Sequence, residues 1–268
     1  MTVPAALRSV LGIAVLGVTL AGCDDEAGAP PRTADRQTST ALPAPAPATT
    51  IRRARTLGRS ARGRRLRVVE LGDPSSARSV LVVGCIHGNE CAGTAITSRL
   101  LRGAAPRDAV LWIVPDLNPD GRAAGTRVNG RGVDLNRNFP SEWRPLQRRG
   151  GPQYSGPRPL SEPETRGIAR FIRARRPRVT IWFHQPQAVV RAWGRSDPAA
   201  RRFARLAGAP FRRIRWPHGS APNWQNHRFP GTSSFVVELA AGELGAAAAG
   251  GYAAAARKLA TALPALQP

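Results

Sequence analysis

Two residues that can bind a metal ion, His87 and Glu90, follow an apolar run in this sequence. The run, residues 80–83, has the composition and length of a buried strand. An imidazole nitrogen and a carboxylate oxygen three residues apart can bind one Zn²⁺ from the same side. A catalytic zinc site also needs a third protein ligand. The candidates for that third ligand are the other histidines of the chain: His184, His218 and His227.

The elements that must position these residues can be read from apolar periodicity. Strands are predicted at residues 66–69, 80–83, 110–114, 179–183, 189–193 and 233–239. Helices are predicted at residues 92–101, 161–175, 197–206 and 245–263, the second of them opened by a capping box of Ser161 and Glu164. A strand–helix–strand order indicates a parallel crossover sheet. The sequence therefore predicts an α/β fold: a single-domain mixed, mostly parallel sheet flanked by helices.

His87 and His184 occupy equivalent places in this predicted sheet, because each follows a buried strand. Side chains at the carboxyl ends of parallel strands converge on one cleft. We therefore expect His184, together with His87 and Glu90, to complete the metal site. The remaining histidines, His218 and His227, fall in predicted loops and are interpreted as polar pocket or surface residues.

The composition allows one ordinary α/β domain with tails, since the chain has 268 residues of which 42% are hydrophobic. The formal net charge is +23, and the positive charge is almost all arginine, with Lys258 the one lysine. Arginine bias of this kind is typical of a GC-rich genome, and its functional alternative is attraction to an anionic polymer. Because no nucleic-acid-binding motif is present, no nucleic-acid partner is expected.

The first fifty residues are predicted to be an export signal and a tether. Residues 1–22 carry a short apolar stretch typical of a secretory signal, and Leu20-Ala21-Gly22-Cys23 resembles the lipobox of bacterial lipoproteins. Residues 23–50 are rich in Ala and Pro and predict a disordered tether starting at lipidated Cys23. The expected location is the outer face of the bacterial cytoplasmic membrane. The alternative is an ordinary signal peptide with a chance cysteine.

Several motifs downstream of His87 and Glu90 point to one family. They are Asn-Pro-Asp-Gly at 118–121, Arg-x-Asn at 127–129, and Gly-Val-Asp-Leu-Asn-Arg-Asn-Phe-Pro at 132–140. With His-x-x-Glu, they resemble the zinc carboxypeptidases of the carboxypeptidase A family, and most of all the bacterial branch of murein peptide amidases. The resemblance covers residues 56–239, and it implies one Zn²⁺ per chain held by His87, Glu90 and His184.

The resemblance also implies roles for polar residues around the metal. Asn136 and Arg137 match the pair that binds the terminal carboxylate of a substrate, and a guanidinium fork suits a planar carboxylate. Arg127 matches the arginine that stabilises the oxyanion. Glu238 matches the general base that activates water. Glu243 is the rival carboxylate, but its place after Gly242 favours a helix start.

Residues 216–224 resemble the specificity loop of the family, so Trp216 and Asn223 are predicted to bind substrate. The sequence departs from the digestive enzymes here, because they carry a mobile tyrosine near this loop. The two tyrosines of this chain, Tyr154 and Tyr252, are far from it in sequence. Trp216 or Arg215 is expected to fill that space.

Cys85 and Cys91 flank the predicted metal-binding turn. In an exported protein they can form a disulfide that braces this turn. Free thiols and metal ligation are the alternatives.

The leading hypothesis is an exported zinc metallocarboxypeptidase that cuts short wall-derived peptides at the γ-D-glutamyl–diaminopimelate bond. One alternative is a general carboxypeptidase acting on protein and peptide C-termini. A second is an inactive wall-binding module. The oligomeric state is left open.

Overall fold

The computed structural model describes residues 50–264, and the predicted signal peptide, most of the tether and Cys23 lie outside this range. Within it, none of the helices is both long and apolar enough to span a membrane. The strands are β1 (Ile51–Arg59), β2 (Arg65–Gly72), β3 (Ser79–Val83), β4 (Val110–Val114), β5 (Val179–His184), β6 (Gln187–Ala192), β7 (Phe211–Arg213) and β8 (Ser233–Ala240). The helices are α1 (Gly93–Arg102), α2 (Pro119–Ala124), α3 (Pro163–Arg175), α4 (Asp197–Ala207), α5 (Ala221–Arg228) and α6 (Ala246–Thr261), with short 3₁₀ turns η1 (Leu135–Arg137) and η2 (Gly194–Ser196).

The predicted mixed, mostly parallel sheet is confirmed. Eight strands pair in the order β1-β2-β4-β3-β5-β8-β6-β7. The central strands β4, β3, β5 and β8 run parallel to one another, and β6 pairs antiparallel with β8. Strands buried on both faces have continuous apolar sequences, which explains why β3, β4 and β5 could be read directly from the sequence. Their carboxyl ends share one edge, and the candidate site lies there.

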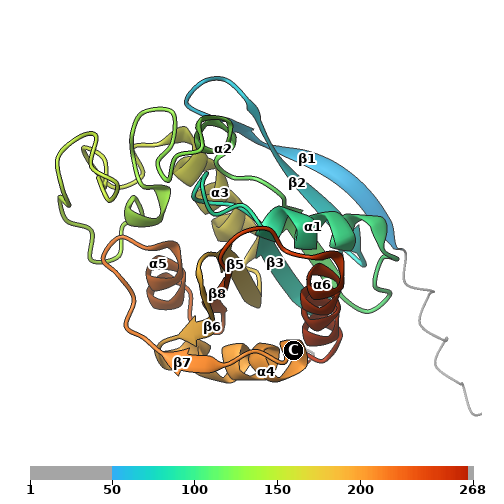
Figure 1. Ribbon diagram of the computed structural model, residues 1–268. Coiled ribbons are helices and arrows are strands. Elements are labelled where there is room, and N and C mark those ends of the chain that lie inside the picture. Colours follow the sequence, from blue (N-terminus) through green and yellow to red (C-terminus); the bar gives the residue numbers. More distant parts are fainter. Residues whose placement is uncertain (1–49, 265–268) are drawn as a thin grey trace, which may run out of the picture. The chain divides into compact units, whose positions relative to one another are not determined.

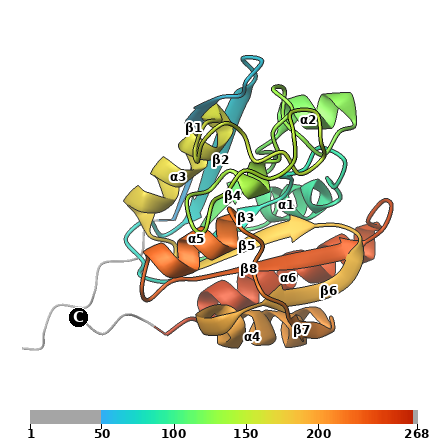
Figure 2. The same cartoon turned by 90° about the vertical axis from the view of Figure 1, so that its left-hand side faces the viewer.

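Helices cover both faces of the sheet. α1, α4 and α6 pack together on one face, whereas α3 lies against β1 and α5 against β8 on the other (Figures 1 and 2). The aromatic residues Phe183, Phe203 and Tyr252 pack together between the first helix layer and the sheet. Two packed layers around a central sheet are the usual way for an α/β domain to bury the apolar surface of its strands.

The structure corrects the prediction at the amino-terminal edge. The sequence predicts a polar turn over residues 55–63 that leads into an edge strand at 66–69, but residues 51–59 themselves form β1, which pairs antiparallel with β2. β2 is therefore the second strand and not the edge. β1 carries no apolar alternation, because its arginines are exposed and Leu57 is its one buried side chain.

The capping box predicted at the start of α3 is also wrong. Glu162, not Ser161, is the N-cap residue of α3, and it makes no side-chain capping bond. Glu164 instead accepts a hydrogen bond from the backbone N–H of Ala61, at 2.8 Å. This carboxylate therefore ties α3 to the β1–β2 turn and does not cap its own helix.

Candidate active site

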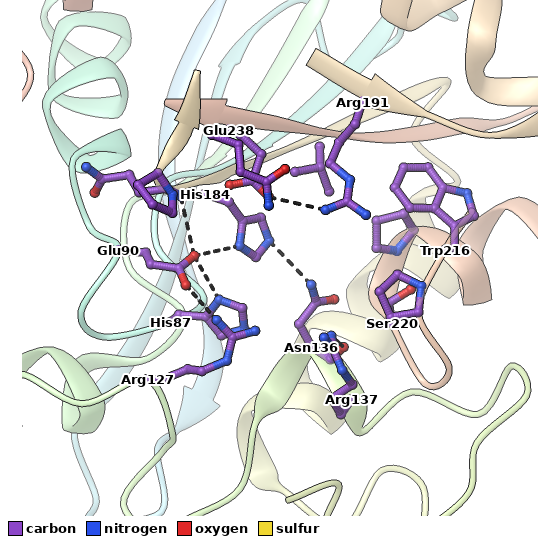
Figure 3. A pocket seen from close by; sticks show the side chains of 16 residues that line it. His87, Glu90, Arg127, Asn136, Arg137, His184, Arg191, Trp216, Ser220 and Glu238 are labelled. Carbon is purple, nitrogen blue, oxygen red and sulfur yellow. Dashed lines mark hydrogen bonds and ion pairs between the residues drawn. The ribbon is translucent and has the colours of Figure 1, made fainter. Parts of the chain in front are cut away.

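A cluster of two imidazoles and one carboxylate lies at the carboxyl ends of β3 and β5. The Nδ1 atoms of His87 and His184 are each 3.0 Å from Oε2 of Glu90 (Figure 3). One potential ligand atom from each of the three residues lies within 4.8 Å of the others. Two imidazole nitrogens and a carboxylate oxygen form a donor set typical of catalytic zinc. The residues present therefore fit the ion that the sequence predicts, and His218 and His227 lie outside the cluster.

Asp134 fixes the orientation of the ligand His87. Its Oδ1 atom lies 2.9 Å from Nε2 of His87 and also accepts the backbone N–H of Asn136, while Oδ2 accepts Nε–H of Arg127. With Nε2 bound to the carboxylate, Nδ1 of His87 is left to face Glu90. A carboxylate behind a metal-binding histidine selects its tautomer and orientation in this way. Asp134 thus positions three site residues without facing the pocket.

Electrostatics in the cluster favour a negative Glu90 and Asp134. Burial would raise the pKa of each carboxyl group, but hydrogen bonds and charge from the histidines outweigh it and hold both pKa values well below their usual range. Burial likewise lowers the pKa of His184 to about 4. Burial opposes charging of His87 too, yet the Asp134 carboxylate raises its pKa. The cluster therefore presents the Glu90 carboxylate and a neutral His184 to a cation, while the Asp134 carboxylate lies behind His87.

The Asn-Pro-Asp-Gly motif holds the ligand turn in place. Asn118 is the N-cap of α2, accepting from the N–H of Gly121, and its Nδ2 donates to the carbonyl of Ile86. Gly88 packs so closely on α2 that an added Cβ would lie 2.0 Å from the backbone of Gly121. The proline and glycine content of residues 115–121 predicts turns, whereas the structure forms the short helix α2 here, and this helix supports the ligand turn.

A disulfide joins Cys85 and Cys91 across the same turn. The two cysteines are six positions apart in the sequence, and both His87 and Glu90 lie between them. Neither cysteine belongs to the metal-binding cluster. The sequence left open a disulfide, free thiols or metal ligation for these cysteines, and the structure has the disulfide. The bond closes a loop that contains two of the three candidate ligands.

Glu238 lies at the carboxyl end of β8, directly beside the ligand strand. Its Cα pairs with that of His184 in the β5–β8 register. Burial raises the pKa of Glu238, and the charge of Arg191, whose Nη1 lies 3.5 Å from its Oε1, opposes that rise. A carboxylate with a raised pKa beside a metal site is suited to taking up and releasing a proton.

One pocket of about 230 Å³ connects these groups. The cluster lines one side, and Asn136, Arg137, Trp216 and Arg191 line the rest (Figure 3). The complete set of residues that line this pocket is His87, Glu90, Arg127, Asn136, Arg137, His184, Gln185, Pro186, Gln187, Arg191, Trp216, Pro217, Ser220, Pro222, Val236 and Glu238.

Of the predicted substrate-binding residues, some line the pocket and one does not. Asn136 orients its amide through the backbone N–H of Ala221, which its Oδ1 accepts at 2.9 Å, and it lines the pocket with Arg137 and Trp216. Asn223 does not line it. This residue lies in the predicted specificity loop, where the structure instead forms helix α5, and its amide donates to Glu142 in a neighbouring hollow. The prediction that Asn223 lines the substrate pocket is therefore wrong, because α5 turns its side chain away from the metal-binding cluster.

Arg127 lies beside the cluster and bridges Glu90 to the carboxylate of Asp134. Its Nη1 donates to Oε1 of Glu90 at 2.6 Å, and its Nε donates to Asp134. About a quarter of its side chain remains exposed, so the guanidinium can still face a group that enters the pocket.

Trp216 lines the pocket, whereas the two tyrosines of the chain lie elsewhere. Tyr252 packs on Phe183 and Phe203, and Tyr154 lines a separate hollow. Trp216 lines the pocket, as expected for the residue that fills the space of the missing tyrosine, whereas Arg215 stacks near Trp193 outside it.

The pocket is also lined by residues that were not singled out from the sequence, among them Arg191 and Ser220. Arg191 stands out as a charged residue in the apolar strand β6, which was the available signal. Ser220 lies in the predicted specificity loop, residues 216–224, but its residue type did not set it apart from its neighbours there.

This fold and this pocket define a zinc carboxypeptidase-like protein, and comparison of the sequence with protein families agrees. The chain belongs to the zinc carboxypeptidase family (Peptidase_M14), whose profile matches residues 48–228. The family expected from the motifs is thereby confirmed.

Particular relatives include murein peptide amidase A of Escherichia coli (strain K12), 33% identical over 127 residues, which cover 43% of this chain and 52% of that protein. Carboxypeptidase N catalytic chain of Mus musculus is 32% identical over 164 residues, covering 46% of this chain and 35% of that protein. The chain thus matches about half the length, or less, of these relatives. Among solved structures, murein-tripeptide amidase MpaA from Escherichia coli O157 superposes with a TM-score of 0.65 at 27% identity, covering 79% of this chain and 92% of that one.

Proposed function

We propose that this protein is a metallocarboxypeptidase that hydrolyses the bond before a C-terminal residue of wall-derived peptides. One observation carries the proposal: a single pocket is lined by a His-Glu-His cluster, a buried carboxylate with a raised pKa, and an amide–guanidinium pair. These are the groups needed to bind a metal, move a proton and anchor a carboxylate.

His87, Glu90 and His184 would hold the zinc ion. When bound there, zinc would supply Lewis-acid chemistry, polarising a carbonyl and lowering the pKa of water. Glu238 accepts a proton from the attacking water and then delivers it to the leaving amine. Its raised pKa suits both steps, because a strongly acidic carboxyl group would accept the proton poorly.

The remaining residues orient the peptide and stabilise charge. Asn136 and Arg137 bind the terminal carboxylate, which places the scissile bond between them and the cluster. Arg127, bonded to Glu90 and Asp134, supports the negative charge that develops on the carbonyl oxygen.

The proposed substrate bond is the one between γ-D-glutamate and diaminopimelate. Its support is the likeness to murein peptide amidase A and to murein-tripeptide amidase MpaA. The predicted signal peptide and lipidated Cys23 would place the enzyme on the outer face of the cytoplasmic membrane, where the wall is built. Both the substrate and the location follow from these likenesses and from sequence patterns.

A general carboxypeptidase is the second candidate. The likeness to carboxypeptidase N catalytic chain favours it, since that relative is about as similar in sequence as the amidases. An inactive wall-binding module fits the pocket less well, because binding alone would not call for a buried carboxylate beside the metal-binding cluster.

The deciding experiment is cleavage of L-Ala-γ-D-Glu-diaminopimelate by the purified protein, with and without a zinc chelator. Release of diaminopimelate that the chelator abolishes supports the wall substrate. Chelator-sensitive trimming of ordinary peptides without release of diaminopimelate shifts the function to the general carboxypeptidase. Zinc binding without turnover on either substrate would favour the wall-binding module.

A further inference from the structure

Arg191 is a third arginine in the pocket, and the mechanism above leaves it without a role. It lies on β6, where its Cα pairs with that of Val236, another pocket residue. Its side chain is 14% exposed. Figure 3 places its guanidinium beside Glu238 and Trp216, on the side of the pocket away from His87 and Glu90.

Most hydrogen-bond donors of the Arg191 guanidinium have no acceptor among the described residues. An arginine has five N–H donors, and within residues 50–264 this one makes a single side-chain hydrogen bond, to Glu238 at 3.5 Å. Its Nε is buried and has no partner among these residues, and the same is true of Oγ of Ser220 in the same pocket. Buried donors without acceptors are unfavourable, so their presence in a pocket indicates a ligand that brings acceptor oxygens.

The other two arginines of the pocket are already engaged. Arg127 donates to Glu90 and Asp134. Arg137, next to Asn136, is assigned to the terminal carboxylate of the substrate. Arg191 therefore offers positive charge beyond what one carboxylate needs, and a second anionic group on the substrate would match it.

We propose that Arg191 is a specificity-determining residue that binds a carboxylate on the side chain of the terminal residue, with the hydroxyl of Ser220 as a second donor. The substrate class is then a peptide whose last residue carries a distal carboxylate. Diaminopimelate has such a group, whereas lysine is the same molecule without it. The inference rests on the proposed function for the position of the terminal residue, which Asn136 and Arg137 anchor.

The ion pair with Glu238 does not account for Arg191 by itself. The contact is at the long limit of a hydrogen bond, and the second oxygen of Glu238 is buried with no partner within residues 50–264. A geometry selected for that pair alone would bring the groups closer, because charge-assisted bonds are short. A substrate carboxylate bound by Arg191 would also leave Glu238 free to accept a proton.

The test compares two terminal residues on two acyl groups. The peptides are L-Ala-γ-D-Glu-diaminopimelate and L-Ala-γ-D-Glu-lysine, and benzoyl-glycyl-diaminopimelate and benzoyl-glycyl-lysine. We expect kcat/KM to favour diaminopimelate over lysine by about 10- to 100-fold, the size of a charge-assisted hydrogen bond, on every acyl group that is cleaved. A ratio near one in the wild-type protein would overturn the proposal.

Variants assign the preference to the residue. Arg191→Gln should bring the ratio close to one, and Arg191→Lys should retain part of it. Arg195→Gln removes an exposed arginine four residues along the chain and should leave the ratio unchanged. Equal losses on both terminal residues in Arg191→Gln would mean that the arginine only supports the pocket or Glu238, and would contradict the proposal.

A binding measurement decides the matter even if no peptide is cleaved or a variant fails to fold. Calorimetry on the wild-type protein should give tighter binding of free diaminopimelate than of free lysine, and equal binding would refute the role of Arg191. The proposed function can fail separately: a diaminopimelate preference confined to benzoyl-glycyl peptides would remove the wall substrate and keep the assignment. Release of diaminopimelate from the γ-D-glutamyl peptide, with no preference for diaminopimelate over lysine, would keep the wall substrate and remove the assignment of Arg191.

Discussion

The two sides of the pocket differ in how fully their polar groups are bonded. On the side formed by the ends of β3 and β5, His87, Glu90 and Asp134 bond to one another and to Arg127. On the side formed by β6, β8 and the loop before α5, buried polar atoms lack partners within residues 50–264. These atoms belong to Arg191, Trp216, Ser220 and Glu238.

The difference separates a site built to hold an ion from one that waits for a substrate. The bonded side is pre-organised, because the histidine orientations are set before any cation arrives. The other side has unfilled bonding capacity, which a substrate can satisfy only while it is bound. Changes on the first side should therefore alter metal affinity, whereas changes on the second should alter turnover and selectivity.

Glu238→Gln should separate the two sides most strongly. The amide has nearly the same shape but cannot accept the proton of water, so kcat should fall by about 10²- to 10⁴-fold. Zinc content, measured by mass spectrometry of the metal, should stay at one per chain.

The matched control for Glu238→Gln is Glu243→Gln, which alters an exposed carboxylate that lines a neighbouring hollow. It should keep full activity. Normal turnover in Glu238→Gln, or loss of its zinc, would mean that the carboxylate is not the base.

Asp134→Asn should act on the opposite side. The amide can still accept from His87, but its NH₂ group would face Nε–H of Arg127, where the carboxylate accepts a bond at 2.9 Å. Loss of an orienting carboxylate typically lowers metal affinity by about 10- to 100-fold. Competition with a chromogenic chelator measures it, with the exposed Asp108→Asn as control. An unchanged affinity would show that this network does not support the ion.

The bonded side was largely predictable from the sequence, and the physical reason is its strands. β3 and β5 are buried on both faces, so each appears as a continuous apolar run, and the ligands follow at their ends. The motif around Asp134 then gave Asn136 and Arg137 by resemblance. From the sequence, the disulfide between Cys85 and Cys91 was only one of several options, because its formation depends on the distance between the two cysteines in the fold.

The less regular parts could not be predicted for identifiable reasons. β1 is an arginine-rich edge strand whose pairing with β2 supplies bonds that no apolar pattern announces. α5 is buried over most of its length although most of its residues are polar, so it has no apolar stripe and no amphipathic pattern, and Asn223 was misplaced as a result. Arg191 was one arginine among many, and only the β6–β8 register reveals that it shares the pocket with Glu238.

The double variant Cys85→Ala with Cys91→Ala sharpens the comparison at the ligand turn. Opening this short loop should lower the free energy of unfolding by about 2 kcal/mol through the entropy of the unfolded chain, measurable by urea denaturation. Zinc affinity should fall because His87 and Glu90 lie within the loop. The preference for diaminopimelate over lysine should survive, since Arg191 lies on the other side, and a loss of that preference would show that the two sides are coupled.

The smallest expected effect is on pH dependence in Arg191→Gln. Glu238 works as a base only when it is deprotonated, so kcat/KM is lost as pH falls through its pKa. Burial already raises that pKa, and the nearby arginine charge opposes the rise. Removing the charge should therefore raise the pKa further and move the acidic limb of the profile to higher pH. A peptide ending in lysine is the right substrate, because it has no distal carboxylate for Arg191 to bind. An acidic limb that stays in place would mean that the pair at 3.5 Å contributes little to the proton affinity of Glu238, and the main role of Arg191 would then be toward the substrate.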